Sequence, residues 1–267
     1  MSDVWVSLVV LAVAVLLSEV ARQAATRVLR GATGALALEA ASTFQLCCCS
    51  HELKLLGDTA RLEPAVSLTL CYAITVVHLL SFRGASCNPC GIVERVCRES
   101  RSVGAALAVI AGQFGAALAA QYATASVWSQ GLSEMHVRHR RFGFRCFDPL
   151  GGTVLEAAAV ELGCAFAVQA VSLHAHKLDK KLRVPVFAAV ITALVYAGGS
   201  ISGAVFNPVL AFSIQFPCSG HTYLEYCFIY WLGPALGIVS CILLFEKILP
   251  FLGRHVPNAA VPKHKSQ

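Results

Sequence analysis

The chain has 267 residues, of which 57% are hydrophobic and 13% are charged, and its formal net charge is +6. Soluble domains carry about a quarter charged residues, so the composition excludes a soluble domain and predicts a polytopic membrane protein in contact with the lipid bilayer. The positive charge is spread over the loops, which relates it to membrane topology and not to nucleic acid.

Residues 1–33 form an N-terminal apolar segment. Val4 to Leu17 are strongly apolar and are followed by Glu19 and several arginines. A signal peptide has its charges before the apolar run and a small-residue cleavage site after it, so we do not expect this segment to be removed. Its apolar run of about 14 to 18 residues fits three alternatives: a short extra membrane span, a helix on the membrane surface, or a signal-anchor.

Residues 34–128 contain three expected spans and one shorter amphipathic stretch. The spans are Gly34–Leu53, Pro64–Ser81 and Val103–Val127, and the shorter stretch runs from Asn88 to about Cys97. A polar loop that is rich in arginine and histidine, residues 129–150, then connects this part of the chain to the next.

Residues 151–250 repeat this organisation, and residues 251–267 form a short basic tail. The spans here are Gly151–His174, Val184–Gly199 and Tyr223–Leu249, and the shorter stretch is Asn207–Phe216. Each repeat has an odd number of spans, so the second repeat enters the membrane in the opposite orientation to the first. The expected fold is therefore all-α, an inverted repeat of three spans and one half-helix.

Two ten-residue stretches, 81–90 and 200–209, share Ser, Gly, Ala, Asn and Pro at the same offsets, 119 residues apart (207 minus 88). Asn is a preferred N-cap, and Pro at the first helical position has a preset φ and lacks an N–H that would go unpaired. One Asn-Pro pair is most simply an ordinary helix cap. The duplication with matched flanks makes Asn88-Pro89 and Asn207-Pro208 a specific signal of two half-helix starts.

Half-helices from two inverted repeats meet N-terminus to N-terminus near the membrane midplane. Capping uses the oxygen of each Asn side chain, which leaves the amide NH2 free to donate to a passing molecule. The positive dipole ends of the helices repel cations and protons, while the two amides bind a polar neutral solute. This arrangement predicts a channel for neutral molecules.

The basic residues predict the orientation of the chain. Under six spans, four basic segments fall on one side of the membrane: Arg22–Arg30, the first Asn-Pro loop, Lys177–Arg183 and the tail. Positively charged loops mark the cytosolic side, so this side is expected to be cytosolic. The basic loop 129–150 falls on the opposite side and breaks the rule. If the N-terminal segment also spans, the N-terminus lies on the non-cytosolic side.

Together with Glu39, Glu156 and the string Tyr230-Trp231-Leu232-Gly233-Pro234, the paired boxes resemble the aquaporin (major intrinsic protein) family over roughly Gly34 to Leu249. The strings 43–49, 51–53, 88–91, 195–200 and 203–208 are similar to its divergent superaquaporin subfamily. The resemblance implies an hourglass of six transmembrane helices and two re-entrant half-helices, assembled as a homotetramer with one pore per subunit. It also implies passive conduction of water, glycerol and hydrogen peroxide, largely at the endoplasmic reticulum.

The resemblance places a selectivity filter at positions that depart from the common aquaporin pattern. Leu210 stands where water channels commonly have Arg, and Val195 stands where many have His. Ala204 is the third filter position, and the second span supplies the fourth, Leu68 or Tyr72. Such a filter lacks a charged donor and replaces the hydrogen bonds of water poorly, which slows water and admits a larger neutral solute.

The favoured function is therefore a passive channel with a wide apolar filter, modestly permeable to water and suited to peroxide or glycerol. The alternative is a non-conducting membrane scaffold of the same fold, in which Cys90 and Val209, both bulkier than the usual Ala, occlude the pore. Both boxes keep Asn and Pro, which a scaffold does not need. No Ser-His-Asp arrangement, phosphate-binding loop or matched pair of C-x-x-C motifs is present, so no enzymatic activity, cofactor or metal is predicted.

Glu39 and Glu156 are carboxylates within expected spans, both in the context Leu-Glu-Ala-Ala, 117 residues apart (156 minus 39). Ionisable groups inside a membrane have a function by default. We favour a structural role, in which each carboxylate accepts hydrogen bonds from the unpaired backbone of an Asn-Pro loop. A proton relay is the alternative.

Cys218 lies nine positions after Val209, as in the superaquaporins. The favoured roles are support of the second loop by packing and stabilisation of the tetramer. The alternative is a disulfide with Cys146 on the same non-cytosolic side, where an oxidising lumen permits it.

The chain ends Lys263-His264-Lys265-Ser266-Gln267. Lys263 and Lys265 look like a cytosolic dilysine retrieval signal, which favours the endoplasmic reticulum membrane over other intracellular membranes or the plasma membrane. A plain solvated basic tail is the alternative.

Overall fold

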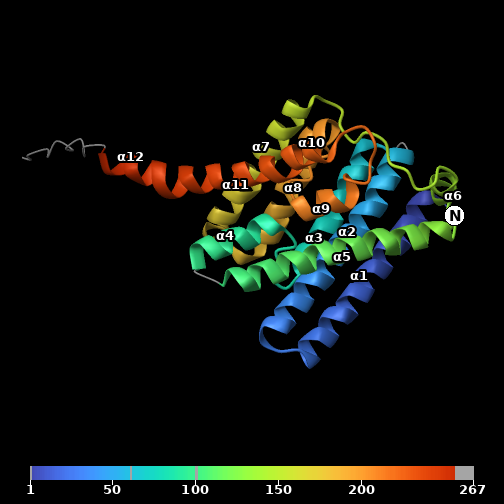
Figure 1. Ribbon diagram of the computed structural model, residues 1–267, viewed down its shortest axis with the longest axis horizontal. Coiled ribbons are helices and arrows are strands. Elements are labelled where there is room, and N and C mark those ends of the chain that lie inside the picture. Colours follow the sequence, from blue (N-terminus) through green and yellow to red (C-terminus); the bar gives the residue numbers. More distant parts are fainter. Residues whose placement is uncertain (1, 61, 100–101, 256–267) are drawn as a thin grey trace, which may run out of the picture.

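The computed structural model describes residues 2–60, 62–99 and 102–255, and none of them forms a strand (Figure 1). The all-α fold predicted from the sequence is confirmed. The helices are α1 (Asp3–Val28), α2 (Gly31–Thr59), α3 (Pro64–Ser81), α4 (Pro89–Glu99), α5 (Val103–Ser129), α6 (Glu134–Arg141), α7 (Val154–His174), α8 (Lys180–Ser202), α9 (Pro208–Ile214), α10 (Tyr223–Cys227), α11 (Gly233–Leu243) and α12 (Leu249–His255). Helices α10–α12 form one continuous rod through π-helical turns at Phe228–Leu232 and Leu244–Ile248.

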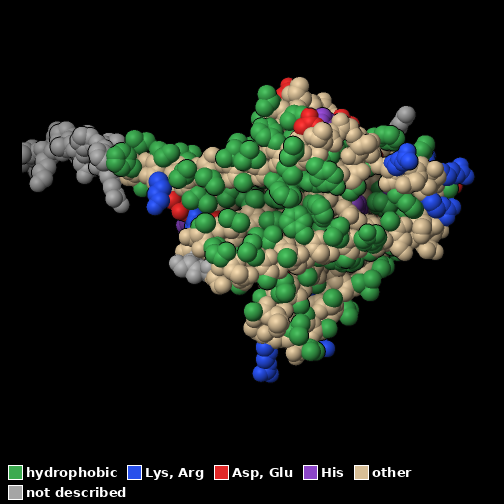
Figure 2. All heavy atoms as spheres, viewed as in Figure 1, with side chains coloured by type: hydrophobic (Ala, Val, Ile, Leu, Met, Phe, Trp, Pro, Cys, Tyr) green, Lys and Arg blue, Asp and Glu red, His purple; other side chains and the backbone are tan. Residues whose placement is uncertain are grey.

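Among the described residues, six helices are long and apolar enough to cross a membrane: α1, α3, α5, α7, α8 and the rod α10–α12. Helix α2 has 29 residues but is more polar, and it keeps Glu39 and Glu52 buried inside the bundle. Hydrophobic side chains dominate the face shown in Figure 2, and most charged groups lie near its margins. An apolar surface of this kind suits contact with lipid hydrocarbon, so the chain is a multi-pass membrane protein.

Helix α1 continues past the apolar run Val4–Leu17 to Val28 and turns back directly into α2. The two helices are antiparallel, because Ser7 Oγ donates to Glu52 Oε1 (2.7 Å) while Arg22 donates to Gln45 Oε1 (2.7 Å). The Arg22 side chain is fully buried by this packing. The length and composition of α1 match a membrane span, which favours an extra span over a helix on the membrane surface.

The remaining helices form two corresponding sets. Helices α2, α3, α4 and α5 make the first, and α7, α8, α9 and the α10–α12 rod make the second. Helix α2 packs against α5, α7 packs in the same way against α11, and α3 meets α8 between the two sets. Gly237 allows the close approach of α11 to α7, since a Cβ there would lie 2.2 Å from the carbonyl oxygen of Leu162.

The bundle has two ends, which we name by the helices that lie there. At the α6 end, Met135 N donates to Asp3 Oδ1 (3.3 Å), and Ser219 N donates to the carbonyl of Cys146 (3.0 Å). At the α4 end, Arg98 forms an ion pair with Glu246. Helix α2 begins at the α4 end, whereas α7 begins at the α6 end. The second repeat is therefore inverted relative to the first.

Candidate pore and its supporting contacts

The two Asn-Pro boxes meet in the middle of the bundle. The amide of Asn88 donates to the carbonyl of Phe206 (3.3 Å), and the amide of Asn207 donates to the carbonyl of Cys87 (2.8 Å). Each Asn thus binds the residue that precedes the other Asn. These two bonds hold the loops of the repeats face to face, as the inverted repeat requires.

Each Asn also caps its own half-helix. Asn207 Oδ1 accepts from the backbone N–H groups of Val209 (3.2 Å) and Leu210 (3.4 Å), and Asn88 Oδ1 accepts from Cys90 N (3.0 Å). The sequence-based assignment of both residues as N-caps is confirmed. The amide groups are less free than predicted, because one N–H of each is used across the interface. An amide carries two N–H donors, so each Asn keeps one for a passing molecule.

The loops are strained where they meet. Cys87 has φ = 51° and Phe206 has φ = 38°, in the left-handed region that residues other than glycine rarely adopt. This conformation turns the carbonyl of each residue toward the opposite Asn. Strain of this kind persists only where surrounding contacts fix the backbone. Two buried glutamates supply those contacts.

Glu39 of α2 supports the first loop, and Glu161 of α7 supports the second. Glu39 accepts from Ser86 N (2.7 Å) and Cys87 N (3.0 Å). Glu161 accepts from Val205 N (2.9 Å) and from the N–H of Phe206. Both carboxylates are buried, and each binds the two backbone groups that precede an Asn. The structural role predicted for Glu39 is the one that it has.

The role predicted for Glu156 is wrong. Glu156 is exposed in the first turn of α7, where its carboxylate accepts from the backbone of Thr153 (2.8 Å) while the Thr153 hydroxyl accepts from Glu156 N (3.3 Å). This reciprocal pair is a capping box, whose signature is Thr or Ser followed three residues later by Glu. That signature assigns Glu156 to a helix start, and Glu161 is then the remaining carboxylate of α7.

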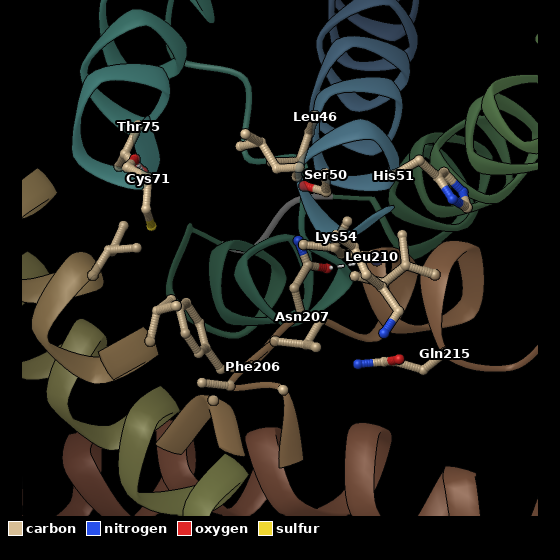
Figure 3. A pocket seen from close by; sticks show the side chains of 18 of the residues that line it. Leu46, Ser50, His51, Lys54, Cys71, Thr75, Phe206, Asn207, Leu210 and Gln215 are labelled. Atoms are coloured by element: carbon tan, nitrogen blue, oxygen red, sulfur yellow. Dashed lines mark hydrogen bonds between the residues drawn. The ribbon is translucent and has the colours of Figure 1, made fainter. Parts of the chain in front are cut away.

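A cavity of about 1610 Å³ is lined by residues from both ends of the bundle and by both Asn residues between them. Lys54 and Arg138 line it at the α6 end, and Glu94 and Arg98 line it at the α4 end. Val195, Ala204 and Leu210 of the predicted filter line the same cavity. Figure 3 shows Leu210 beside Asn207, on the side toward Gln215.

The filter position predicted on α3 is not part of the cavity wall. Neither Leu68 nor Tyr72 lines the cavity; Ser67, Leu70, Cys71, Ile74, Thr75, His78 and Leu79 do so. Figure 3 shows Cys71 and Thr75 on the α3 wall. Successive helical residues are rotated by about 100°, so Leu68 and Tyr72 lie on a neighbouring face of α3. Phe206, which the sequence did not single out, also lines the cavity.

The third residues of the boxes do not narrow the pore. Val209 has no exposed surface and packs in a cluster with Cys47 and Ala117, and neither Val209 nor Cys90 lines the cavity. Pro89 and Pro208 stand at the first positions of α4 and α9, where no N–H is needed.

A disulfide joins Cys146 to Cys218 at the α6 end. It connects the loop after α6 to the segment after α9, 72 residues apart. Ser219 N donates to the carbonyl of Cys146 (3.0 Å) and Tyr226 Oη donates to the carbonyl of Cys218 (3.2 Å), so the backbone is held on both sides of the bridge. The alternative considered for Cys218, a disulfide with Cys146, is therefore the one present, and the favoured role as a free packing residue is wrong. Cys146 also lines the cavity, which places the bridge at its mouth.

A buried polar cluster that the sequence did not indicate anchors α1 at the same end. The carboxylate of Glu52 accepts from Ser7 Oγ (2.7 Å) and Trp128 Nε1 (2.8 Å), and it lies 3.1 Å from His136 Nε2. These residues come from α1, α2, α5 and α6, and all are buried. The tail lysines Lys263 and Lys265 lie outside the described residues.

Comparison with known proteins gives relatives along nearly the whole chain. Aquaporin-11 from Homo sapiens is 40% identical over 253 residues, which cover 94% of this chain and 93% of that protein. Aquaporin-11 from Mus musculus is 36% identical over 251 residues (94% and 92%). Aquaporin-12 from Mus musculus is 34% identical over 239 residues (88% and 82%). No protein-family model matches the chain.

Proposed function

The chain belongs to the aquaporin family, in its superaquaporin branch, and from this premise we propose that it is a passive channel for small neutral solutes: water, glycerol and hydrogen peroxide. The observation that carries the proposal is the cavity that passes both Asn residues and is lined by residues from both ends of the bundle. Such a cavity, enclosed by helices of membrane-spanning length, provides a path for a solute that cannot cross the lipid.

The Asn pair provides the polar contacts in the middle of this path. Each Asn amide is oriented by its cap and by its bond to the opposite loop, so its remaining N–H has a fixed direction. A solute oxygen that accepts these N–H groups regains part of the hydration that it loses on entry. The N-termini of α4 and α9 meet at the same point, and their positive ends oppose the entry of cations and protons.

Val195, Ala204 and Leu210 contribute an apolar part of the cavity wall. Water is a small solute that needs several hydrogen bonds, and an apolar wall replaces few of them. Peroxide and glycerol have more than one oxygen, so part of the molecule can stay hydrogen-bonded at Asn207 while the rest passes the apolar wall. The channel should therefore conduct water modestly and favour these larger neutral molecules.

We further propose a cytosolic α4 end, location in the endoplasmic reticulum membrane, retrieval through Lys263 and Lys265, and assembly as a homotetramer. The basic residues at the α4 end, including Arg83, Arg95 and Lys181, support this orientation under the positive-inside rule. The disulfide at the α6 end supports it as well, because disulfides persist in oxidising compartments such as the lumen.

A non-conducting scaffold is the competing function. In that function the bulky Cys90 and Val209 would occlude the pore, but neither side chain lines the cavity. Transport by purified protein in liposomes decides between the two. Water entry is followed by stopped-flow light scattering and peroxide entry by an enclosed fluorescent probe, for the wild type, Leu210→Arg, and Leu182→Arg as the matched control on an exposed position of α8.

The channel predicts that the wild type exceeds empty liposomes for both water and peroxide. Leu210→Arg should reduce peroxide entry about fivefold, because it places a long charged side chain in the cavity, while Leu182→Arg should conduct like the wild type. Folded protein that raises the flux of neither water, glycerol nor peroxide would refute the channel and establish the scaffold.

A further inference from the structure

Lys54 brings a positive charge into the cavity that the sequence pattern of the boxes does not reveal. It lies on α2, one turn after His51, and lines the cavity together with Leu210 and Gln215. In Figure 3 its side chain extends past Leu210 and its amine points toward the Gln215 amide. Leu210 holds the position at which many water channels have Arg, so a cation from another helix faces the place where that charge is missing.

The charge of Lys54 is only weakly neutralised. Among the described residues it forms an ion pair with Asp58, at 3.4 Å, and the Asp58 side chain is 64% exposed against 25% for Lys54. An ion pair with an exposed carboxylate is weak, because solvent competes for the carboxylate. Lys54 therefore remains a cation that is partly withdrawn from solvent, at the level of Leu210 in the cavity.

The other charges at the α6 end do not cancel it. Arg138, Arg145 and Asp148 line this part of the cavity, and all three are exposed. With Lys54 and Asp58, the described residues that line the cavity at this end include three cations and two anions. Burial, and to a smaller extent electrostatic repulsion from His136, lowers the pKa of His139, so that this residue is neutral at neutral pH. The net charge at this mouth is thus positive.

Gln215 supplies the complementary polar group. Its side chain is 2% exposed, and its Oε1 is buried without a hydrogen-bond partner among the described residues. A buried acceptor without a donor is costly, which indicates that a donor comes from the cavity. Gly203, at φ = 85°, makes room for this amide, since a Cβ there would lie 2.5 Å from Gln215 Nε2.

We propose that Lys54 and Gln215 together form the polar selectivity site at the α6 end of the pore, in place of the arginine that Leu210 replaces. The ammonium of Lys54 donates to an oxygen of the solute and repels cations, while Gln215 Oε1 accepts an O–H from the same solute. The site thus suits a small neutral molecule whose hydroxyl groups both donate and accept, such as a peroxide or a polyol. This inference rests on the proposed channel function.

The test measures two properties of the same liposomes: peroxide entry, and proton leak under an imposed potassium diffusion potential, followed by an enclosed pH dye. The variants are Lys54→Met, which keeps the length and removes the charge, Lys54→Arg, which keeps the charge, and Gln215→Met. Lys181→Met, on the exposed start of α8, is the matched control. Each variant must be monodisperse and must retain the disulfide.

Lys54→Met should raise the proton leak about five- to tenfold and lower peroxide entry about threefold, because both the repulsion of cations and a donor are lost. Lys54→Arg should restore the barrier to protons, and Lys181→Met should behave like the wild type. Gln215→Met should lower peroxide entry without raising the leak.

A wild type that conducts peroxide, with Lys54→Met unchanged in both measurements, would overturn the inference and leave the channel function standing. Equal changes in Lys54→Met and Lys54→Arg would overturn it as well, since the charge would not be the cause. A wild type equal to empty liposomes in both measurements would refute the channel function itself, and the inference with it.

Discussion

Replacing Glu161 by Ala tests which carboxylate supports the second Asn-Pro loop. Glu161 accepts three hydrogen bonds, from Ser202 Oγ (2.7 Å), Val205 N (2.9 Å) and the N–H of Phe206. In the Ala variant the Ser202 hydroxyl can rotate to another acceptor, but the two backbone donors stay buried and unpaired. Each such donor costs about 1–3 kcal/mol, so Glu161→Ala should lower the free energy of unfolding by about 4 kcal/mol.

For a protein of this size, 1 kcal/mol corresponds to roughly 2–4 °C in the unfolding temperature, so Glu161→Ala should unfold about 8–16 °C below the wild type. Glu161→Gln keeps one acceptor oxygen and should lose about half as much. The assay is thermal unfolding of purified protein in detergent, followed by intrinsic fluorescence. All variants are heated at one scan rate, because unfolding of membrane proteins is often irreversible.

Glu156→Ala is the matched control, since the sequence alone assigned the same role to Glu156. Its carboxylate is exposed and belongs to the capping box with Thr153, so its removal should change the unfolding temperature by no more than about 2 °C. A larger loss in Glu156→Ala than in Glu161→Ala would refute the assignment of Glu161 as the support of the loop.

Three further predictions concern the contacts around the pore. Cys218→Ser should lower the free energy of unfolding by about 2–4 kcal/mol, and Cys146→Ser should lower it by the same amount. A reductant should bring the wild type to the unfolding temperature of these variants, and a wild type whose unfolding temperature does not change on reduction would contradict a stabilising bridge. Glu52→Ala leaves the Trp128 and His136 side chains without their buried partner, while the Ser7 hydroxyl can rotate, so it should lower the free energy of unfolding by about 4 kcal/mol. It should also speed tryptic cleavage after the arginines of α6, and cleavage at the wild-type rate would show that the cluster does not hold α6. Asn207→Asp can still cap α9 but cannot donate to the carbonyl of Cys87. It should therefore lower the free energy of unfolding by about 1–2 kcal/mol in chemical denaturation and raise the proton leak of liposomes. An unchanged free energy of unfolding would mean that the hydrogen bond across the loops does not stabilise the protein.

Features that depend on neighbouring residues were predictable from the sequence. The second expected span, Pro64–Ser81, matches α3 at both bounds, and α4 and α9 begin directly after Asn88 and Asn207. These boundaries are set by caps, prolines and apolar length, which act within a few residues of the chain. The expected start of the fifth span, Val184, was less accurate, because α8 already begins at Lys180. Basic side chains are good helix formers, so charge alone did not end the helix.

Features that depend on the rotation and pairing of helices were not predictable in the same way. Leu68 and Tyr72 lie on one face of α3, while Cys71, Ile74 and Thr75 lie on the face that lines the cavity. The apolar pattern of a membrane helix does not distinguish these faces, because lipid and neighbouring helices both accept apolar side chains. Only the packing of α3 against α8 decides which of them borders the pore.

The sequence by itself determined that this is an all-α membrane protein with two inverted Asn-Pro half-helices, because hydropathy, capping chemistry and internal repetition are properties of the chain. Tertiary structure decided which carboxylate supports each loop, that Cys146 pairs with Cys218, and that Lys54 lines the same cavity as Leu210. Each of these contacts joins residues that are far apart in sequence. Their geometry depends on how whole helices are placed and turned, which short patterns in the chain do not encode.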